Sequence, residues 1–144
     1  MSETRDLLRL AADLGAGFRE SLPNRPVPPA ASAEELRAEL GGPLPEGPSD
    51  PAAVTRELAA ASEPGLMATP GGRFFGFVIG GTLPAALAAD VLTTAWDQNA
   101  GLYVAAPAAA VAEEIAGAWL VELLGLPREA SFALGPPTGR MPPS

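Results

Sequence analysis

The frequency of helix-breaking residues is the feature of this sequence that most limits its fold. The chain contains 17 prolines and 16 glycines in 144 residues. Proline lacks the amide hydrogen that a helix interior needs, and glycine favours helix ends, so both residues stop helices. Their main clusters lie at residues 23–29, 41–48, 80–84 and 125–127. We therefore expect a mainly α chain of about five helices joined by extended segments.

A first amphipathic helix is expected over residues 4–22, where Leu7, Leu14 and Phe18 recur at helical spacing. The proline-rich residues 23–29 follow at once and should run extended. A helix before such a rigid arm must bury its apolar stripe against something. Packing on this chain's own core and packing on a second subunit are both open.

Cap signals mark the later helices. Ser32 and Glu35 have the spacing of a capping box, and Asp50 stands as an N-cap before Pro51. The helix after Asp50 should bury a stripe made of Val54, Leu58 and Ala61. Pro107 begins the last helix, which should end near residue 125.

The central stretch, residues 73–99, reads RFFGFVIGGTLPAALAADVLTTAWDQN. Its aromatic-rich residues 74–79 suit a buried strand or an extended core segment. Gly76 inside that run suggests that another backbone or a ligand approaches closely. A helical pattern follows and contains Asp90 in an apolar context, where the carboxylate must reach solvent or be paired.

The inventory of reactive side chains excludes several classes of chemistry. The sequence contains no Cys, no His and no Lys, and all nine basic residues are Arg. Disulfides, Cys/His zinc sites, Ser-His triads and a lysine Schiff base are therefore impossible within this chain. We expect no catalytic residue and no metal site here, so any enzymatic chemistry must come from elsewhere.

Charge and hydropathy limit the partners. The net charge of −8 argues against nucleic acid and anionic lipid. The uncharged run at 74–89 is shorter than the roughly 20 residues that span a bilayer, so no membrane partner is expected. Charged residues near the N-terminus replace the apolar run of a secretory signal, which makes the cytoplasm the expected location.

Several motifs together resemble a known family. They are the FFGF run at 74–77, the LAAD helix ending at Asp90, the LTTAWDQN stretch, the Ala106-Pro107 pair, the Glu113-Glu114 pair and the ELLGLP ending at Pro127. In this order and spacing, over residues 7–132, they resemble the N-terminal part of pyridoxal-phosphate-dependent group II decarboxylases. That family acts on aromatic amino acids, glutamate, histidine and related substrates.

The resemblance implies the N-terminal portion of an α/β fold-type-I enzyme that works as a homodimer on an amino acid. By resemblance, the substrate pocket would include Phe77, Val78, Ile79, Gly80, Asn99 and Gly101, the last two reaching the neighbouring subunit's site. Residues 1–64 would form dimer-wrapping helices and a proline-rich arm, and residues 65–132 would begin the large domain.

The sequence departs from the family after residue 132, where a Pro/Gly-rich tail replaces the strand and loop that help to hold the cofactor phosphate. Such a tail is what a lost reading frame would leave. The family's cofactor-stacking His and Schiff-base Lys are absent from this chain. We therefore expect a truncated decarboxylase that neither binds pyridoxal phosphate nor acts alone, and that exposes residues 74–79. The alternative is a non-catalytic helical interaction or dimerisation module that folds independently.

Overall fold

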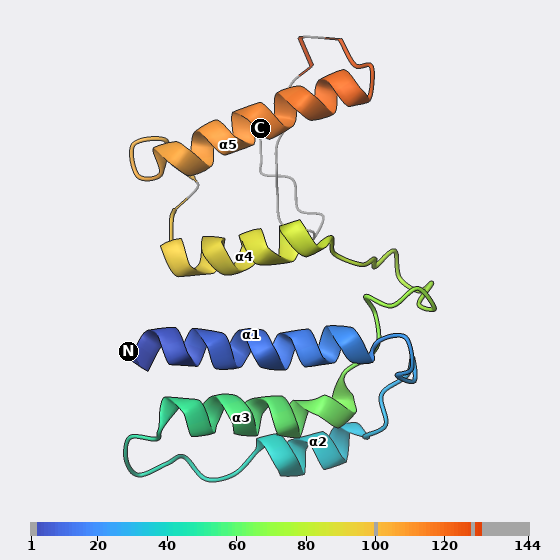
Figure 1. The fold of residues 1–144 in the computed structure, drawn as a ribbon, viewed down its shortest axis with the longest axis vertical. Coiled ribbons are helices and arrows are strands. Elements are labelled where there is room, and N and C mark those ends of the chain that lie inside the picture. The colour runs from blue at the N-terminus through green and yellow to red at the C-terminus, as the bar shows by residue number, and fades with distance from the viewer. Residues whose placement is uncertain (1–2, 100, 128, 131–144) are drawn as a thin grey trace. The chain divides into compact units, whose positions relative to one another are not determined.

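The computed structural model describes residues 3–99, 101–127 and 129–130, so the tail predicted at 133–144 lies outside the described residues. These ranges form five α-helices and one 3-10 helix, with no strand among them (Figure 1). The elements are α1 (Glu3–Ser21), α2 (Ala33–Leu40), α3 (Pro51–Ser62), η1 (Glu63–Gly65), α4 (Pro84–Trp96) and α5 (Pro107–Leu123). The expectation of a mainly α chain with about five helices is confirmed.

The chain divides into two compact units, Met1–Leu83 and Pro84–Ser144. The first unit contains α1, α2, α3 and η1, and the second contains α4 and α5. The division predicted from the sequence, at residues 1–64, 65–132 and 133–144, stays a prediction.

Helix α3 organises the first unit. It lies between α1 and α2 and contacts both, and η1 continues from its end to contact α2 as well (Figure 1). The proline-rich arm runs along residues 64–68, to which backbone hydrogen bonds join it. Ala30 N donates to Pro64 O at 2.8 Å, and Ala68 N donates to Val27 O at 3.1 Å. The arm therefore packs on its own unit in this structure.

The predicted caps are confirmed. Ser32 N donates to Glu35 Oε2 at 2.7 Å, and Glu35 N donates to Ser32 Oγ at 3.2 Å, which completes the capping box of α2. These bonds to the backbone and hydroxyl of Ser32 hold the pKa of the Glu35 carboxyl below its usual value. Asp50 Oδ2 accepts from Ala53 N at 2.8 Å, so that α3 begins with Pro51 as expected.

The expectation of a buried strand or an extended core segment at residues 74–79 was wrong, because these residues contain no strand and most of them are exposed. These residues form turns, with Phe74 N bonded to Gly71 O and Ile79 N to Gly76 O at 3.1 and 3.2 Å. A strand needs a neighbouring strand for its backbone groups, and the described residues supply none. The close approach inferred for Gly76 is made by the ring of Phe74, because a Cβ at this glycine would lie 3.2 Å from Phe74 Cζ.

The stripe expected to be buried on α3 was also wrong in part. Val54 and Leu58 are exposed, and they line a groove between α2 and α3 of about 900 Å³. Ala61, the third member of the stripe, is half-buried and lines the same groove. Of the expected stripe, only this small residue is partly covered.

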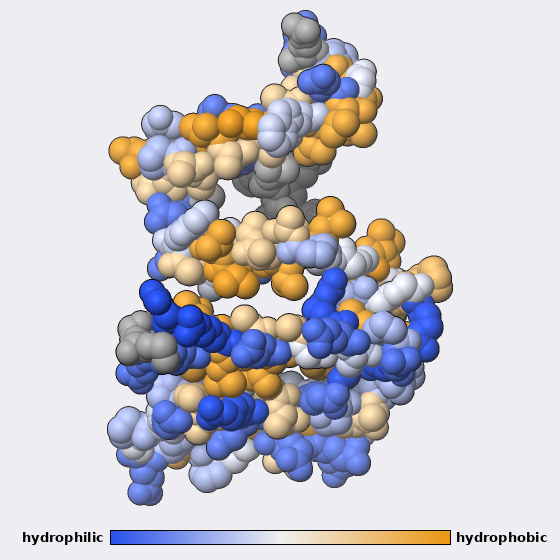
Figure 2. Space-filling model, viewed as in Figure 1, coloured by the Kyte–Doolittle hydropathy of each residue, from blue (hydrophilic) through white to orange (hydrophobic). Residues whose placement is uncertain are grey.

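The second unit buries little apolar surface in the described residues. Every residue of α4 is exposed, and no packing joins α4 to α5. Apolar side chains are visible along both helices (Figure 2). Asp90 is among the exposed residues of α4, so its carboxylate reaches solvent. This is one of the two alternatives expected from the sequence. Across the described ranges, no helix is both long and apolar enough to cross a membrane.

The end of α5 satisfies its carbonyls through a glycine. Gly125 has φ of +63°, and its N–H donates to Glu122 O at 3.1 Å. Leu126 N donates to Val121 O at 3.0 Å, which completes a Schellman motif. The sequence expectation that Gly125 ends this helix is confirmed.

Replacing Ser32 by Ala should lower the free energy of unfolding of the first unit by about 1 kcal/mol, because the N-terminal amides of α2 lose their acceptor. Urea unfolding followed by circular dichroism measures the change. Thr55→Ala is the control, since the Thr55 hydroxyl only donates to Pro51 O within α3 and its loss should be neutral. Equal destabilisation by the two variants would contradict the assignment.

The same capping box sets a pH dependence. Because the pKa of Glu35 is lowered in the folded chain, its contribution is present above the unfolded pKa and is lost as the pH falls through the folded value. The stability difference between the parent chain and Glu35→Ala should therefore shrink at acidic pH.

Candidate functional site

The six residues predicted to line a substrate pocket lie in two exposed loops, one in each unit. Phe77, Val78, Ile79 and Gly80 belong to the loop before α4, and Asn99 and Gly101 follow α4. Phe77 is 85% exposed and Val78 is 107% exposed, so their side chains contact almost no other part of the described chain. The members of each loop lie near one another because they are neighbours in the sequence.

The first loop contains a strained turn. Residues 76–79 form a hydrogen-bonded turn whose two central residues, Phe77 and Val78, have φ of 56° and 55°. Positive φ at both central positions favours Gly, Asn or Asp, because a Cβ crowds the backbone there. The cost is about 1–2 kcal/mol for each residue, and it is greatest for β-branched side chains such as that of Val78. This loop therefore holds two large apolar side chains in solvent at a conformational cost.

The second loop is stabilised by its own polar side chains. Asn99 Oδ1 accepts from Gly101 N at 3.0 Å, which is an Asx turn. Gln98 Nε2 donates to Trp96 O at 2.7 Å at the end of α4. Asp97 has φ of 47°, a conformation that Asp tolerates better than most residues. The side chains of Gln98 and Asn99 thus bond to the backbone of their own loop.

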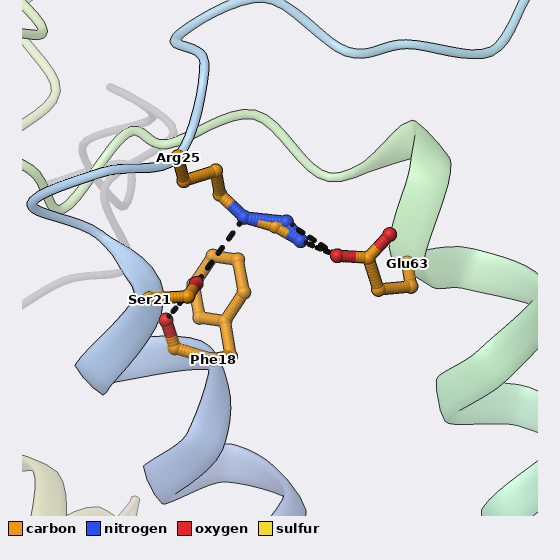
Figure 3. Close-up of polar contacts among 4 residues, drawn as sticks. All are labelled: Phe18, Ser21, Arg25 and Glu63. Carbon is orange, nitrogen blue, oxygen red and sulfur yellow. Dashed lines mark hydrogen bonds and ion pairs between the residues drawn. The ribbon is translucent and has the colours of Figure 1, made fainter.

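A cluster of polar contacts surrounds Arg25, in the proline-rich arm (Figure 3). Its Nη1 donates to Glu63 Oε1 at 2.8 Å, and its Nη2 donates to the same oxygen. Its Nε lies 3.5 Å from Ser21 Oγ, and its Cζ lies 4.9 Å from the centre of the Phe18 ring. The Arg25 side chain is only 10% exposed. One guanidinium therefore joins the end of α1, the arm and η1.

A second arginine holds the loop that leads to the central stretch. Arg73 Nη2 donates to Leu22 O at 3.4 Å and also to Arg25 O. Further on, Thr82 O accepts from Arg19 Nη2 at 3.0 Å. The segment between residues 73 and 82 is thus tied to α1 and the arm at both of its ends.

A groove of about 590 Å³ lies between α1 and α3 beside the Arg25 cluster. Its lining is mainly apolar and includes Leu14, Phe18, Leu58 and Leu66. Two of the polar side chains that line it, Glu63 and Ser21, both contact Arg25. In the described residues no three side chains that could ligate a metal ion come together. This arrangement can hold the unit together.

Comparison with known proteins gives one informative similarity. The chain is 28% identical over 125 residues to tryptophan decarboxylase 1 of Oryza sativa subsp. japonica. The matched region covers 87% of this chain and 24% of that protein, so the chain spans about a quarter of the relative's length. No family model and no solved structure matches the chain significantly. The similarity supports the resemblance noted from the motifs at the level of the family.

Sequence analysis did not find the Arg25 cluster. Arg25 and Glu63 are 38 residues apart, and neither belongs to a recognisable motif. An arginine between prolines, in an arm that must pack on something, is the one available signal. It does not identify the partner.

Replacing Arg25 by Ala should lower the free energy of unfolding of the first unit by about 2 kcal/mol, because a mostly buried guanidinium loses its hydrogen bonds and its contact with Phe18. Glu63→Gln should cost under about 1 kcal/mol, since the Glu63 side chain is 62% exposed and solvent screens the pair. Chemical denaturation measures both variants. A larger loss in Glu63→Gln would show that the ion pair, and not the packing, dominates.

Replacing Val78 by Gly should stabilise the turn by about 1 kcal/mol, once the extra freedom of glycine in the open state is subtracted. Hydrogen exchange at the Ile79 amide should then slow about five-fold. Val104→Gly is the matched control, because Val104 is also exposed and also third in a turn, with Ala105 N bonded to Leu102 O. Val104 has no positive φ, so glycine there should speed exchange at Ala105.

Proposed function

We propose that this chain is part of a pyridoxal-phosphate-dependent amino acid decarboxylase, a carboxy-lyase of the group II family. Its residues would form one wall of a substrate pocket and part of a dimer seam in an α/β fold-type-I homodimer in the cytoplasm. The observation that carries the proposal is the 125-residue similarity to a tryptophan decarboxylase, which spans both loops that contain the predicted pocket residues. The exposure of Phe77 and Val78 supports it, because a pocket wall lacks cover when the other walls are absent.

The residues present do not fit the cofactor by themselves. Pyridoxal phosphate is held in such enzymes as an imine with a lysine, and this chain contains no lysine and no histidine. We therefore assign this chain a positioning and enclosing role, and the chemistry to residues outside these 144.

The substrate side of the proposal follows from the loop before α4. Phe77, Val78 and Ile79 are apolar and would contact the side chain of an amino acid substrate by apolar packing. Aromatic and branched side chains of this kind suit an aromatic substrate better than a charged one. The turn at residues 99 and 101 would contact the neighbouring subunit's pocket and line part of it with backbone atoms.

The decisive experiment uses the coding sequence that surrounds these 144 residues. A product extended in frame, and carrying the cofactor lysine, should release carbon dioxide from an aromatic amino acid. In that product Phe77→Ala should lower kcat/KM at least about ten-fold, or about 1.4 kcal/mol. Phe75→Ala, at an exposed phenylalanine outside the predicted pocket, should change kcat/KM less than about two-fold.

Two outcomes would defeat the proposal. One is a surrounding frame that encodes no lysine-bearing segment. The other is an imine absorbance band when the 144-residue chain, with its N-terminal amine blocked, is mixed with pyridoxal phosphate.

A helical interaction module is the second candidate, and the internal bonding of the first unit favours it. The Arg25 cluster and the arm hold α1, α3 and η1 together without any other chain. A module of this kind should give a sharp thermal melt and a monodisperse dimer in size-exclusion chromatography. A broad melt or polydisperse material would instead favour the decarboxylase fragment.

A further inference from the structure

Residues 74–79 combine the properties of a self-pairing segment. Their sequence, FFGFVI, contains three phenylalanines and two β-branched residues, with no proline and no charge. The run without charged residues continues to residue 89. Short uncharged segments of high β-propensity are the ones that form stacked strands with identical copies.

The structure presents this segment to solvent. Phe75 is 92% exposed, and Phe77 and Val78 are more than four-fifths exposed. The backbone hydrogen bonds of the segment are those of Phe74 N to Gly71 O and Ile79 N to Gly76 O. In the described part of the chain, most of its amide and carbonyl groups therefore lack a protein partner. Such unpaired backbone is a template for strand addition.

The conformation of the segment also favours a change to strand. Phe77 and Val78 have positive φ, whereas both residue types prefer extended backbone. Pairing as a strand would remove that strain. The ends of the segment are fixed by Arg73 and by the bond from Arg19 to Thr82 O, so the apolar residues are displayed from an anchored base.

We propose that residues 74–79 are a self-association segment through which copies of this chain pair as cross-β strands. A second copy is the fitting partner, because identical side chains without charge stack in register. This inference does not depend on the proposed function. A complete enzyme that covers the segment would suppress the association.

A competing segment lies at residues 102–105, where Tyr103 and Val104 are also exposed. It is less suited to pairing, because Pro107 follows it and the amides of Ala105 and Ala106 already donate to Leu102 O. The described backbone there contains no positive φ, so no strain is released by extension. This segment supplies the matched control.

The test incubates the purified 144-residue chain at a concentration on the order of 0.1 mM and follows thioflavin T fluorescence. Fibre diffraction should then show the strand spacing of about 4.7 Å. Val78→Lys should lengthen the lag at least about ten-fold, since a charge in the centre of the stack is unpaired. Val104→Lys makes the same change of residue and charge and should assemble like the parent. Phe75→Lys should repeat the effect of Val78→Lys, and circular dichroism should show the parent's helix content in all three variants.

Four results would overturn the proposal. They are a parent chain that stays monomeric, aggregates without the strand spacing, a Val78→Lys lag equal to that of the parent, and equal inhibition by Val104→Lys. The last would mean that general hydrophobic adhesion, rather than residues 74–79, drives association.

Discussion

Short helices depend on burying one apolar face against a neighbour. That requirement explains why helix packing differs between the two units. Isolated helices below about 12–15 residues are marginal in water, so α2 and α3, with 8 and 12 residues, need tertiary contacts. In the first unit α3 supplies a neighbour to α1 and α2, and Arg25 connects the arm to η1. In the second unit α4 and α5 lack such mutual packing. The proposal of a larger enzyme accounts for this contrast, because another part of the protein would cover them.

The features that the sequence predicted well are those decided by neighbouring residues. The capping box of Ser32 and Glu35, the Pro51 start of α3 and the Gly125 end of α5 depend on groups within five residues of each other. Backbone sterics and local hydrogen bonds decide such features without help from the rest of the fold. The helix count could be predicted for the same reason.

Prediction failed where distant residues decide the outcome. The strand propensity of residues 74–79 expresses how well such side chains pack in a sheet, and the described chain offers no sheet. Arg25 finds Glu63 across 38 residues, a pairing that no local pattern encodes. Of the candidate site, resemblance could name the pocket residues. Their arrangement into a pocket depends on surfaces that the sequence of these loops does not specify.

The use of arginine in the first unit has a consequence for chemical modification of the chain. Arg19 bonds Thr82 O, Arg25 bonds Glu63 of η1, and Arg73 bonds Leu22 O, so arginines make the long-range side-chain bonds described above. A guanidinium carries five N–H donors in one plane, whereas an ammonium group carries three on a single nitrogen. One arginine can therefore bond two acceptors, as Arg73 does with the carbonyls of Leu22 and Arg25. Because the chain contains no lysine, reagents directed at lysine amines leave these contacts in place.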